Sequence, residues 1–316
     1  MAKLTGRVNM NASNMSEKPR GTPAKSAGAQ MDITQAINRL DALPAMPVIA
    51  QKLLALQMGS EVSEKMLLML IEQDPQISAK IIGMANSAMV APTRQVVSVR
   101  GAAMLLGITR VYSVSIGIAI MSLMNKINPR WFSMQDLWSH SFGIAFAMTG
   151  IARFMPSQSR PKEDQILLAG LLHDIGYLAL AFLDPQRSDE LHGCLAAEPE
   201  RPALAIEKEM LEISHDELGA KLARHWNLPD EIIAALRYHH TPDEAKTAAA
   251  EGQTLARMIN IVEKLLTSFS FVEYVTPGVS DSEWETLGID PAMAEKINEK
   301  VAEQAEHALQ FTRTFA

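Results

Sequence analysis

The stretch LLAGLLHDIGYLALAFL, residues Leu167–Leu183, decides how this chain folds. It is almost wholly apolar, which predicts a buried helix, yet His173 and Asp174 lie near its middle. Burying an ionisable pair costs several kcal/mol unless a hydrogen-bond network or a cation compensates it. The stretch therefore predicts a polar site inside a helical core, and the other histidines indicate which kind of compensation applies.

The composition favours an all-α fold. Of the 316 residues, 47% are hydrophobic, 5% are aromatic and 19 are Met, and Leu, Ala and Met propagate helices well. This length suffices for one large or two ordinary domains with a sizeable core. The formal net charge of −7 gives no electrostatic reason to expect a nucleic acid or an anionic membrane. We therefore predict neither as a partner.

The cellular location is predicted from cysteine usage and from the apolar stretches. Cys194 is the single cysteine, so no internal disulfide forms, and a reducing, cytoplasmic compartment fits. Residues Met1–Gln30 lack the apolar core of a signal peptide and are too polar to fold, which predicts a disordered tail. The stretches Gly101–Met124 and Gln165–Leu183 are apolar enough to raise a membrane question. Both contain ionisable residues, so we expect buried core helices.

Three helical regions are predicted after the tail. Residues 31–128 show helical spacing of apolar residues but no titratable cluster, which predicts an N-terminal subdomain for packing or partner docking. Within it, Asp74-Pro75 is a clear helix start, because Asp caps free backbone donors and Pro suits the first helical position. A break at Asn128-Pro129-Arg130 opens a second helical subdomain, residues 129–270. Residues 271–316 are predicted as a C-terminal helical extension.

Five histidines of the second subdomain lie on apolar helix faces or at helix ends: His140, His173, His215, His239 and His240. Each one alone also fits an ordinary role. A histidine on an apolar stripe, such as His140, is usually a core residue, and His215 fits the first turn of a capped helix. His239 and His240 would be cations stabilised by the end of a helix, whose field favours protonation.

Taken together, these histidines and Asp174 favour a metal site. Imidazole nitrogens suit Fe, Mn, Zn or Co, and a shared carboxylate can bridge two such ions. A divalent transition metal, in a mononuclear or dinuclear site, is therefore the expected cofactor, and no organic cofactor is expected.

The residues also resemble a known family. His140, His173-Asp174, His215 and His239-His240, in that order, resemble the HD phosphohydrolase superfamily, and longer motifs resemble its HDOD branch over about residues 31–270. These motifs are LPAMPVIAQKLLAL, IEQDPQISAKIIGMANSA, RGAAMLLGI, AGLLHDIGYLAL and HDELGAKLARHWNLPDEIIAALRYHHTP. The resemblance implies an all-helical HDOD fold, in which the N-terminal subdomain packs on an HD-like subdomain. It also implies a bacterial signalling or regulatory module.

The resemblance implies a set of metal ligands: His140, His173, Asp174, His215, His239 and His240. Superfamily enzymes place a final carboxylate, usually Asp, in a late helix, and Glu263 falls about there with one methylene more. A solvated helix face is the alternative for Glu263. His192, His225 and His307 have no equivalent placement and are left out of the set.

Two departures from the related HD-GYP enzymes argue against inherited catalysis. Those enzymes have a Lys after His-Asp-x-Gly, where this chain has Tyr177, and a lysine can stabilise phosphate charge. The Gly-Tyr-Pro signature expected after the double histidine is also absent, because Thr241-Pro242 follows His240. The sequence therefore predicts a regulatory HDOD protein with a metal-binding site, weak or no catalysis and a signalling protein as partner.

The alternative function is a metal-dependent phosphohydrolase that acts on a nucleotide or a cyclic dinucleotide. In that case His173 and Asp174 would be the catalytic pair, and Asp174 would bridge metal ions that activate a water. Lys221 or Arg237 would then hold the charge of the substrate. Nucleic-acid binding is disfavoured by the acidic balance and by the lack of a basic and aromatic stripe.

Overall fold

The computed structural model describes residues 43–87, 90–123, 133–245, 250–266 and 278–313. Within these ranges every regular element is a helix, which confirms the predicted all-α class. The predicted tail and the two predicted subdomain boundaries, at 128/129 and 270/271, lie outside the described residues. Those three assignments stay predictions.

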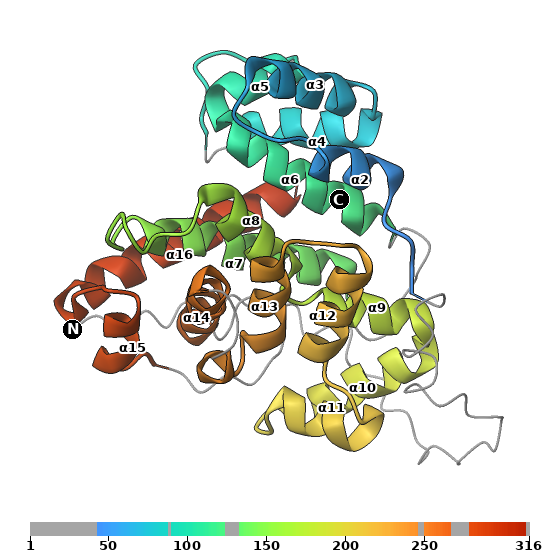
Figure 1. Ribbon diagram of the computed structural model, residues 1–316, viewed down its shortest axis with the longest axis vertical. Helices are drawn as coiled ribbons and strands as arrows, with labels where there is room; N and C mark the ends of the chain where they lie inside the picture. The colour runs from blue at the N-terminus through green and yellow to red at the C-terminus, as the bar shows by residue number, and fades with distance from the viewer. Residues whose placement is uncertain (1–42, 88–89, 124–132, 246–249, 267–277, 314–316) are drawn as a thin grey trace, which may run out of the picture. The chain divides into compact units, whose positions relative to one another are not determined.

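The first five helices of the described residues gather at the top of Figure 1, and three of them begin at a residue whose side chain accepts a backbone N–H of the first turn. The carboxylate of Asp74 accepts hydrogen bonds from the backbone N–H of Gln76 (2.9 Å) and Ile77 (3.0 Å), so the predicted helix start is confirmed. Of these helices, the last is almost wholly buried and packs against the helix that leads to His173. The five are α2 (Val48–Leu54), α3 (Glu61–Glu72), α4 (Pro75–Ala85), α5 (Val99–Leu106) and α6 (Ile108–Met121).

The remaining helices build the part of the fold that carries the histidines. A first group contains the apolar stretch Leu167–Leu183 and the helices around it: α7 (Met134–Ala152), α8 (Glu163–Leu172), α9 (Ile175–Leu183), α10 (Pro185–Ala197), α11 (Ala203–Leu211), α12 (His215–His225) and α13 (Asp230–Tyr238). A second group follows them: the 3-10 turn η4 (Pro242–Glu244), α14 (Ala250–Leu265), α15 (Asp281–Thr286), η5 (Pro291–Met293) and α16 (Ala294–Thr312).

The apolar stretch Leu167–Leu183, expected as one helix, is two helices that meet at His173 and Asp174. Asp174 leaves helical geometry, with φ −96° and ψ 15°. Just beyond the break, a Cβ on Gly176 would lie 1.9 Å from the carbonyl oxygen of His215. Only glycine permits this approach, so the break in the stretch brings the start of α12 against the His-Asp pair.

The described chain ends pack on this histidine-bearing part. The indole N–H of Trp226 donates to the carbonyl oxygen of Pro44 over 2.8 Å, which fixes the segment before α2 against the end of α12. Near the other end, α16 packs along α7, where the buried hydroxyls of Ser139 and Thr312 lie 2.7 Å apart. Both contacts support α7 and α12, two of the helices that carry candidate ligands.

One helical stretch of the described residues, Glu163–Leu183, is long and apolar enough to cross a membrane. Of its most apolar window, 89% is buried inside the fold. The pair α5 and α6 passes the same test only as a single span bent by 118°. The surrounding helices bury Glu163–Leu183, and this burial accounts for the apolar character of the stretch.

Candidate metal centre

Seven predicted side chains converge in the interior from five parts of the fold. They come from α7, from the junction of α8 and α9, from the start of α12, from the end of α13 and from α14. All are buried except the half-buried His240, and the structure brings together the whole predicted set: His140, His173, Asp174, His215, His239, His240 and Glu263.

The carboxylate of Asp174 lies at the middle of the cluster and faces a different pair of histidines with each oxygen. Its Oδ2 lies 3.1 Å from Nε2 of His173 and 3.5 Å from Nε2 of His140. Its Oδ1 lies 3.5 Å from Nε2 of His215 and 3.8 Å from Nε2 of His239. This is the arrangement of a carboxylate that bridges two ions.

Glu263 faces the same cluster from α14. Its Oε1 lies 3.7 Å from Nε2 of His173, and its Oε2 lies 3.8 Å from Nδ1 of His240. The solvated-face alternative for this residue is wrong, because its side chain is 3% exposed. The extra methylene of Glu, compared with Asp, lets the carboxylate reach the histidines from a separate helix.

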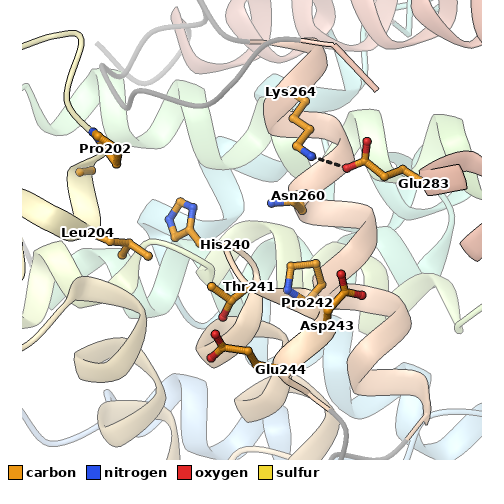
Figure 2. A pocket seen from close by; sticks show the side chains of 11 residues that line it. Pro202, Leu204, His240, Thr241, Pro242, Asp243, Glu244, Asn260, Lys264 and Glu283 are labelled. Carbon is orange, nitrogen blue, oxygen red and sulfur yellow. Dashed lines mark hydrogen bonds and ion pairs between the residues drawn. The ribbon is translucent and has the colours of Figure 1, made fainter. Parts of the chain in front are cut away.

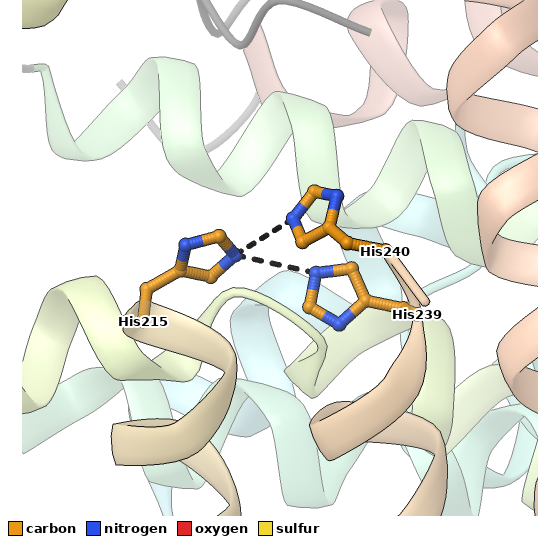
Figure 3. A group of neighbouring side chains, drawn as sticks. All are labelled: His215, His239 and His240. Carbon is orange, nitrogen blue, oxygen red and sulfur yellow. Dashed lines mark hydrogen bonds between the residues drawn. The ribbon is translucent and has the colours of Figure 1, made fainter. Parts of the chain in front are cut away.

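Figure 3 shows how His215 meets the two histidines after α13. Nε2 of His215 lies 3.2 Å from Nε2 of His239 and 3.0 Å from Nε2 of His240. Two donor atoms bound to one ion at about 2.1 Å lie about 3.0–3.5 Å apart. The three rings are therefore spaced as ligands of a single ion.

Hydrogen bonds on the outer nitrogens fix which ring nitrogen faces the cluster. Nδ1 of His173 lies 2.8 Å from the carbonyl oxygen of Gly170, and Nδ1 of His239 lies 2.7 Å from that of Leu236. A carbonyl oxygen only accepts, so both Nδ1 atoms donate, and in the neutral rings both Nε2 atoms present lone pairs. Lone pairs directed at one another and at a carboxylate repel unless a metal ion or a shared proton lies between them.

Glu207 is a functional residue that sequence reasoning missed. Its buried carboxylate accepts from Nδ1 of His215 (2.8 Å), from the backbone N–H of His215 (2.8 Å) and from the hydroxyl of Tyr177 (2.7 Å). The ring of Tyr177 also stacks on His215, with centroids 4.4 Å apart. Such outer partners orient a ligating histidine and raise its basicity. The signal was present, because Glu207 lies on the apolar stripe between Ala203 and Leu211.

His239 and His240, which follow α13, are not the protonated helix-end cations described above as one role for them. Burial and the neighbouring histidines lower the pKa of both His239 and His240 well below the ordinary value. Desolvation therefore outweighs the field of the helix end, which would favour protonation. Burial alone would raise the pKa of the Asp174 carboxyl, but His173, His140 and His215 hold it well below its usual range. An anionic Asp174 carboxylate beside neutral rings at His239 and His240 favours metal binding, because metal ligands must be deprotonated.

The donor set fits a divalent transition metal. Imidazole nitrogens and carboxylate oxygens suit Fe, Mn, Zn or Co, and within each candidate group of three the ligand atoms lie within 4.8 Å of one another. The groups are His140–His173–Asp174, Asp174–His239–Glu263 and His215–His239–His240. Because Asp174 and His239 each belong to two groups, the cluster can hold more than one ion.

A pocket of about 520 Å³ reaches the cluster at His240 (Figure 2). Its wall carries the carboxylates of Asp243, Glu244 and Glu283 and a single ammonium, that of Lys264. Lys264 is ion-paired with Glu283, as the dashed line in Figure 2 marks. The carboxylate of Asp243 is likewise paired, with Arg257 over 3.2 Å, so the wall of the approach holds more carboxylates than cations but no ammonium free for a substrate.

The basic residues considered for holding substrate lie elsewhere. Neither Lys221 nor Arg237 lines this pocket. The guanidinium of Arg237 bonds the carboxylates of Asp216 (2.5 Å) and Glu217 (3.0 Å), so its charge is compensated within the fold. Tyr177, the residue noted above as standing in place of the lysine of the HD-GYP enzymes, is fully buried, and its hydroxyl donates to Glu207.

The three histidines left out of the predicted set belong to none of the metal-ligand groups found among the described residues. One of them, His192, is buried behind Tyr177, and its Nδ1 lies 2.7 Å from the carbonyl oxygen of Ser188. The others are His225 and His307.

Comparison with known proteins gives a family match and distant relatives. Residues 43–242, well over half of the chain, match the family model of the HDOD domain. An uncharacterized protein of Treponema pallidum (strain Nichols) is 26% identical over 220 residues, 66% of this chain and 40% of that protein. A ribonuclease Y of Thermotoga petrophila is 25% identical over 215 residues, 61% of this chain and 36% of that protein. The chain thus spans about two fifths of the length of these relatives.

Solved structures share the fold. A crystal structure described as a candidate signal transduction protein of Marinobacter aquaeolei VT8 superposes with a TM-score of 0.74 at 24% identity, covering 90% of this chain and 64% of that one. An HDOD domain protein of unknown function from Geobacter sulfurreducens gives a TM-score of 0.66 at 21% identity, covering 86% and 99%. At these identities the likeness establishes the helical arrangement.

Proposed function

Because this chain belongs to the HDOD domain family, we propose that it is a bacterial regulatory module whose buried cluster binds a divalent transition metal. In this proposal it hydrolyses phosphate esters weakly or not at all, acts in the cytoplasm and has a signalling protein as partner. The contrast between the ligand cluster and its approach carries the proposal. Seven ligand candidates converge, while the pocket beside them presents three carboxylates, two of them paired with a cation, and one ammonium that is itself ion-paired.

An approach of this charge disfavours phosphate substrates. A phosphate group carries about −1.5 to −2 charges near neutral pH and is stabilised in hydrolases by cations placed around it. Here Arg237 is held by two carboxylates, and Lys264 by Glu283. The bound metal would supply polarisation and an acidified water, while the protein would supply little to position the phosphate.

Metal quantification and activity on the same preparation test the proposal. The full chain, purified without chelator, is expected to contain a transition metal by elemental analysis, and Asp174→Ala should remove it. The same protein, supplied with Mn, Fe or Co, should turn over neither nucleotides nor cyclic dinucleotides at an enzymatic rate. Robust turnover that disappears in both His173→Ala and Asp174→Ala would overturn the regulatory assignment, and absence of metal after reconstitution would overturn the metal site.

A metal-dependent phosphohydrolase is the second candidate, and one observation favours it. The two oxygens of Asp174 face separate histidine pairs, as a dinuclear centre requires. In such a centre the metals would lower the pKa of a bound water and polarise the phosphoryl oxygens, with Asp174 and His173 as the residues that act. Because one relative is named ribonuclease Y, the activity assay should include an RNA oligonucleotide beside the nucleotides.

A further inference from the structure

A second cavity, of about 180 Å³, lies where α6, α7 and the start of α8 meet. Three arginines line it: Arg110 from α6, Arg153 at the end of α7 and Arg160 from the following loop. The only carboxylate in its wall is that of Glu163. This concentration of positive charge stands out in a chain whose formal net charge is −7.

The hydrogen bonds and ion pairs of the lining residues compensate little of this charge, and outside the lining Arg153 interacts electrostatically with Glu303. The distance from Nη2 of Arg110 to Oε1 of Glu163 is 3.6 Å, longer than the about 2.7–2.9 Å of a charge-assisted hydrogen bond. The guanidinium of Arg160 donates to a neutral acceptor, the carbonyl oxygen of Met155, over 2.7 Å. Three guanidinium groups therefore surround a cavity with one loosely placed carboxylate.

Arg110 has an unsatisfied hydrogen-bond donor in this arrangement. Its Nε is buried and has no hydrogen-bond partner among the described residues. Burial lowers the pKa of its guanidinium, Glu163 raises it, and the positive charge of Arg153 lowers it further. The guanidinium lies over the ring of Phe146, 5.8 Å from its centroid. A half-buried guanidinium with an unused N–H is less favourable than one whose surroundings an anion completes.

We propose that this three-arginine cavity binds the phosphate group of a small phosphomonoester. Three guanidinium charges against one carboxylate match the charge of about −1.5 to −2 on a phosphate monoester better than the single charge of a carboxylate. The planar fork of arginine also suits phosphate oxygens. The cavity is smaller than the about 300–1,000 Å³ typical of sites for drug-sized ligands, so it takes the phosphate and a few further atoms.

The site is distinct from the metal centre and does not depend on the function proposed for that centre. Glu163 begins α8, and His173 follows its last residue. Ten helical residues span about 15 Å, so a phosphate among the arginines cannot touch the metal ligands. Binding at the two places can therefore be separated by mutation.

Calorimetric titration of the full chain with glycerol 3-phosphate tests the proposal. The probe should bind wild type and Asp174→Asn alike, whereas Arg153→Glu should weaken binding by at least about tenfold. Arg153 is exposed, so this substitution leaves the core intact, and circular dichroism checks the fold. Arg100→Glu, an equal change of charge at an exposed site outside the cavity, should bind as wild type does.

Three results would overturn the proposal. They are no binding to wild type, equal binding to wild type and Arg153→Glu, and loss of binding in Asp174→Asn alone, which would place the probe at the metal centre. Titrations with inorganic phosphate and with sulfate, at matched ionic strength, show whether the cavity prefers a phosphomonoester to a free inorganic anion. A phosphomonoester site requires glycerol 3-phosphate to bind more tightly than inorganic phosphate, and both to bind more tightly than sulfate.

Discussion

The cluster of candidate metal ligands and the pocket beside it differ in how completely they are built. In the cluster, every candidate ligand points inward and at least three have an outer nitrogen held by an acceptor. In the pocket, the one ammonium is paired and carboxylates dominate the wall. Metal binding depends on donor atoms close to the ion, whereas phosphate chemistry also needs charges around the substrate. A fold can keep the donor atoms that bind a metal and lack the charges that hold a phosphate.

Removing the central carboxylate should have the largest effect on this comparison. Asp174→Asn takes away the anion that both histidine pairs face, so metal affinity should fall by more than about 100-fold, beyond the range of outer-partner mutations. Metal competition with a chromogenic chelator measures the change. Glu299→Gln, a carboxylate exposed on α16, is the control and should bind as wild type does. Retention of wild-type affinity by Asp174→Asn would show that the cluster is not a metal site.

Changing the carboxylate behind His215 should have the next largest effect. Glu207→Gln replaces one accepting carboxylate oxygen by an amide NH₂, which then faces the N–H and O–H groups that donated to it. His215 should lose its orientation, and metal affinity should drop about 10- to 100-fold. Tyr177→Phe removes one hydrogen bond to the same carboxylate and should cost less. If the Tyr177 variant loses as much affinity as the Glu207 variant, Glu207 does not position His215.

Acidification should destabilise the metal-free protein. Burial lowers the pKa of His192, His239 and His240 in the folded state, whereas in the unfolded chain histidine titrates near about 6.5. The folded state binds fewer protons, so this contribution to stability is complete above about pH 6.5 and is lost as the pH falls from there toward the folded-state pKa. Urea unfolding with chelator, at about pH 7.5 and about pH 5.5, should give the lower midpoint in acid. An unchanged midpoint would contradict neutral buried histidines.

The smallest expected effect is a gain in nucleotide affinity at the pocket beside His240. Glu283→Gln removes the partner of Lys264 while keeping a side chain that can cap α15, so nucleotide binding to the metal-loaded protein should strengthen about two- to fivefold. Fluorescence titration with a labelled nucleotide measures it. Glu285→Gln, exposed and outside the pocket, is the matched control. Equal gains in both variants would mean that general charge, and not the release of Lys264, is responsible.

Capping residues and prolines in the sequence predicted several helix boundaries of the fold. The Asp74-Pro75 start and the capping pair of Ser214 and Glu217, whose backbone N–H and carboxylate lie 3.4 Å apart, lie where residue spacing predicts them. Proline spacing marks a further boundary, because the segment Leu191–Leu211 is divided between α10 and α11 by the turn at residues 198–202. Pro199 directly follows Glu198, the C-cap residue of α10, so its ring explains why the first helix does not continue, and Pro202 precedes the first residue of α11.

The sequence by itself determined the all-α class, the HDOD family and the set of seven inward-facing ligand candidates, because spacing and residue type are local properties of the chain. Only the tertiary structure decided that Glu207 and Tyr177 hold His215, that Lys264 is paired with Glu283 and that three arginines meet around one cavity. Each of these depends on how separate helices pack, and small shifts in packing move a charged group between a partner and a substrate.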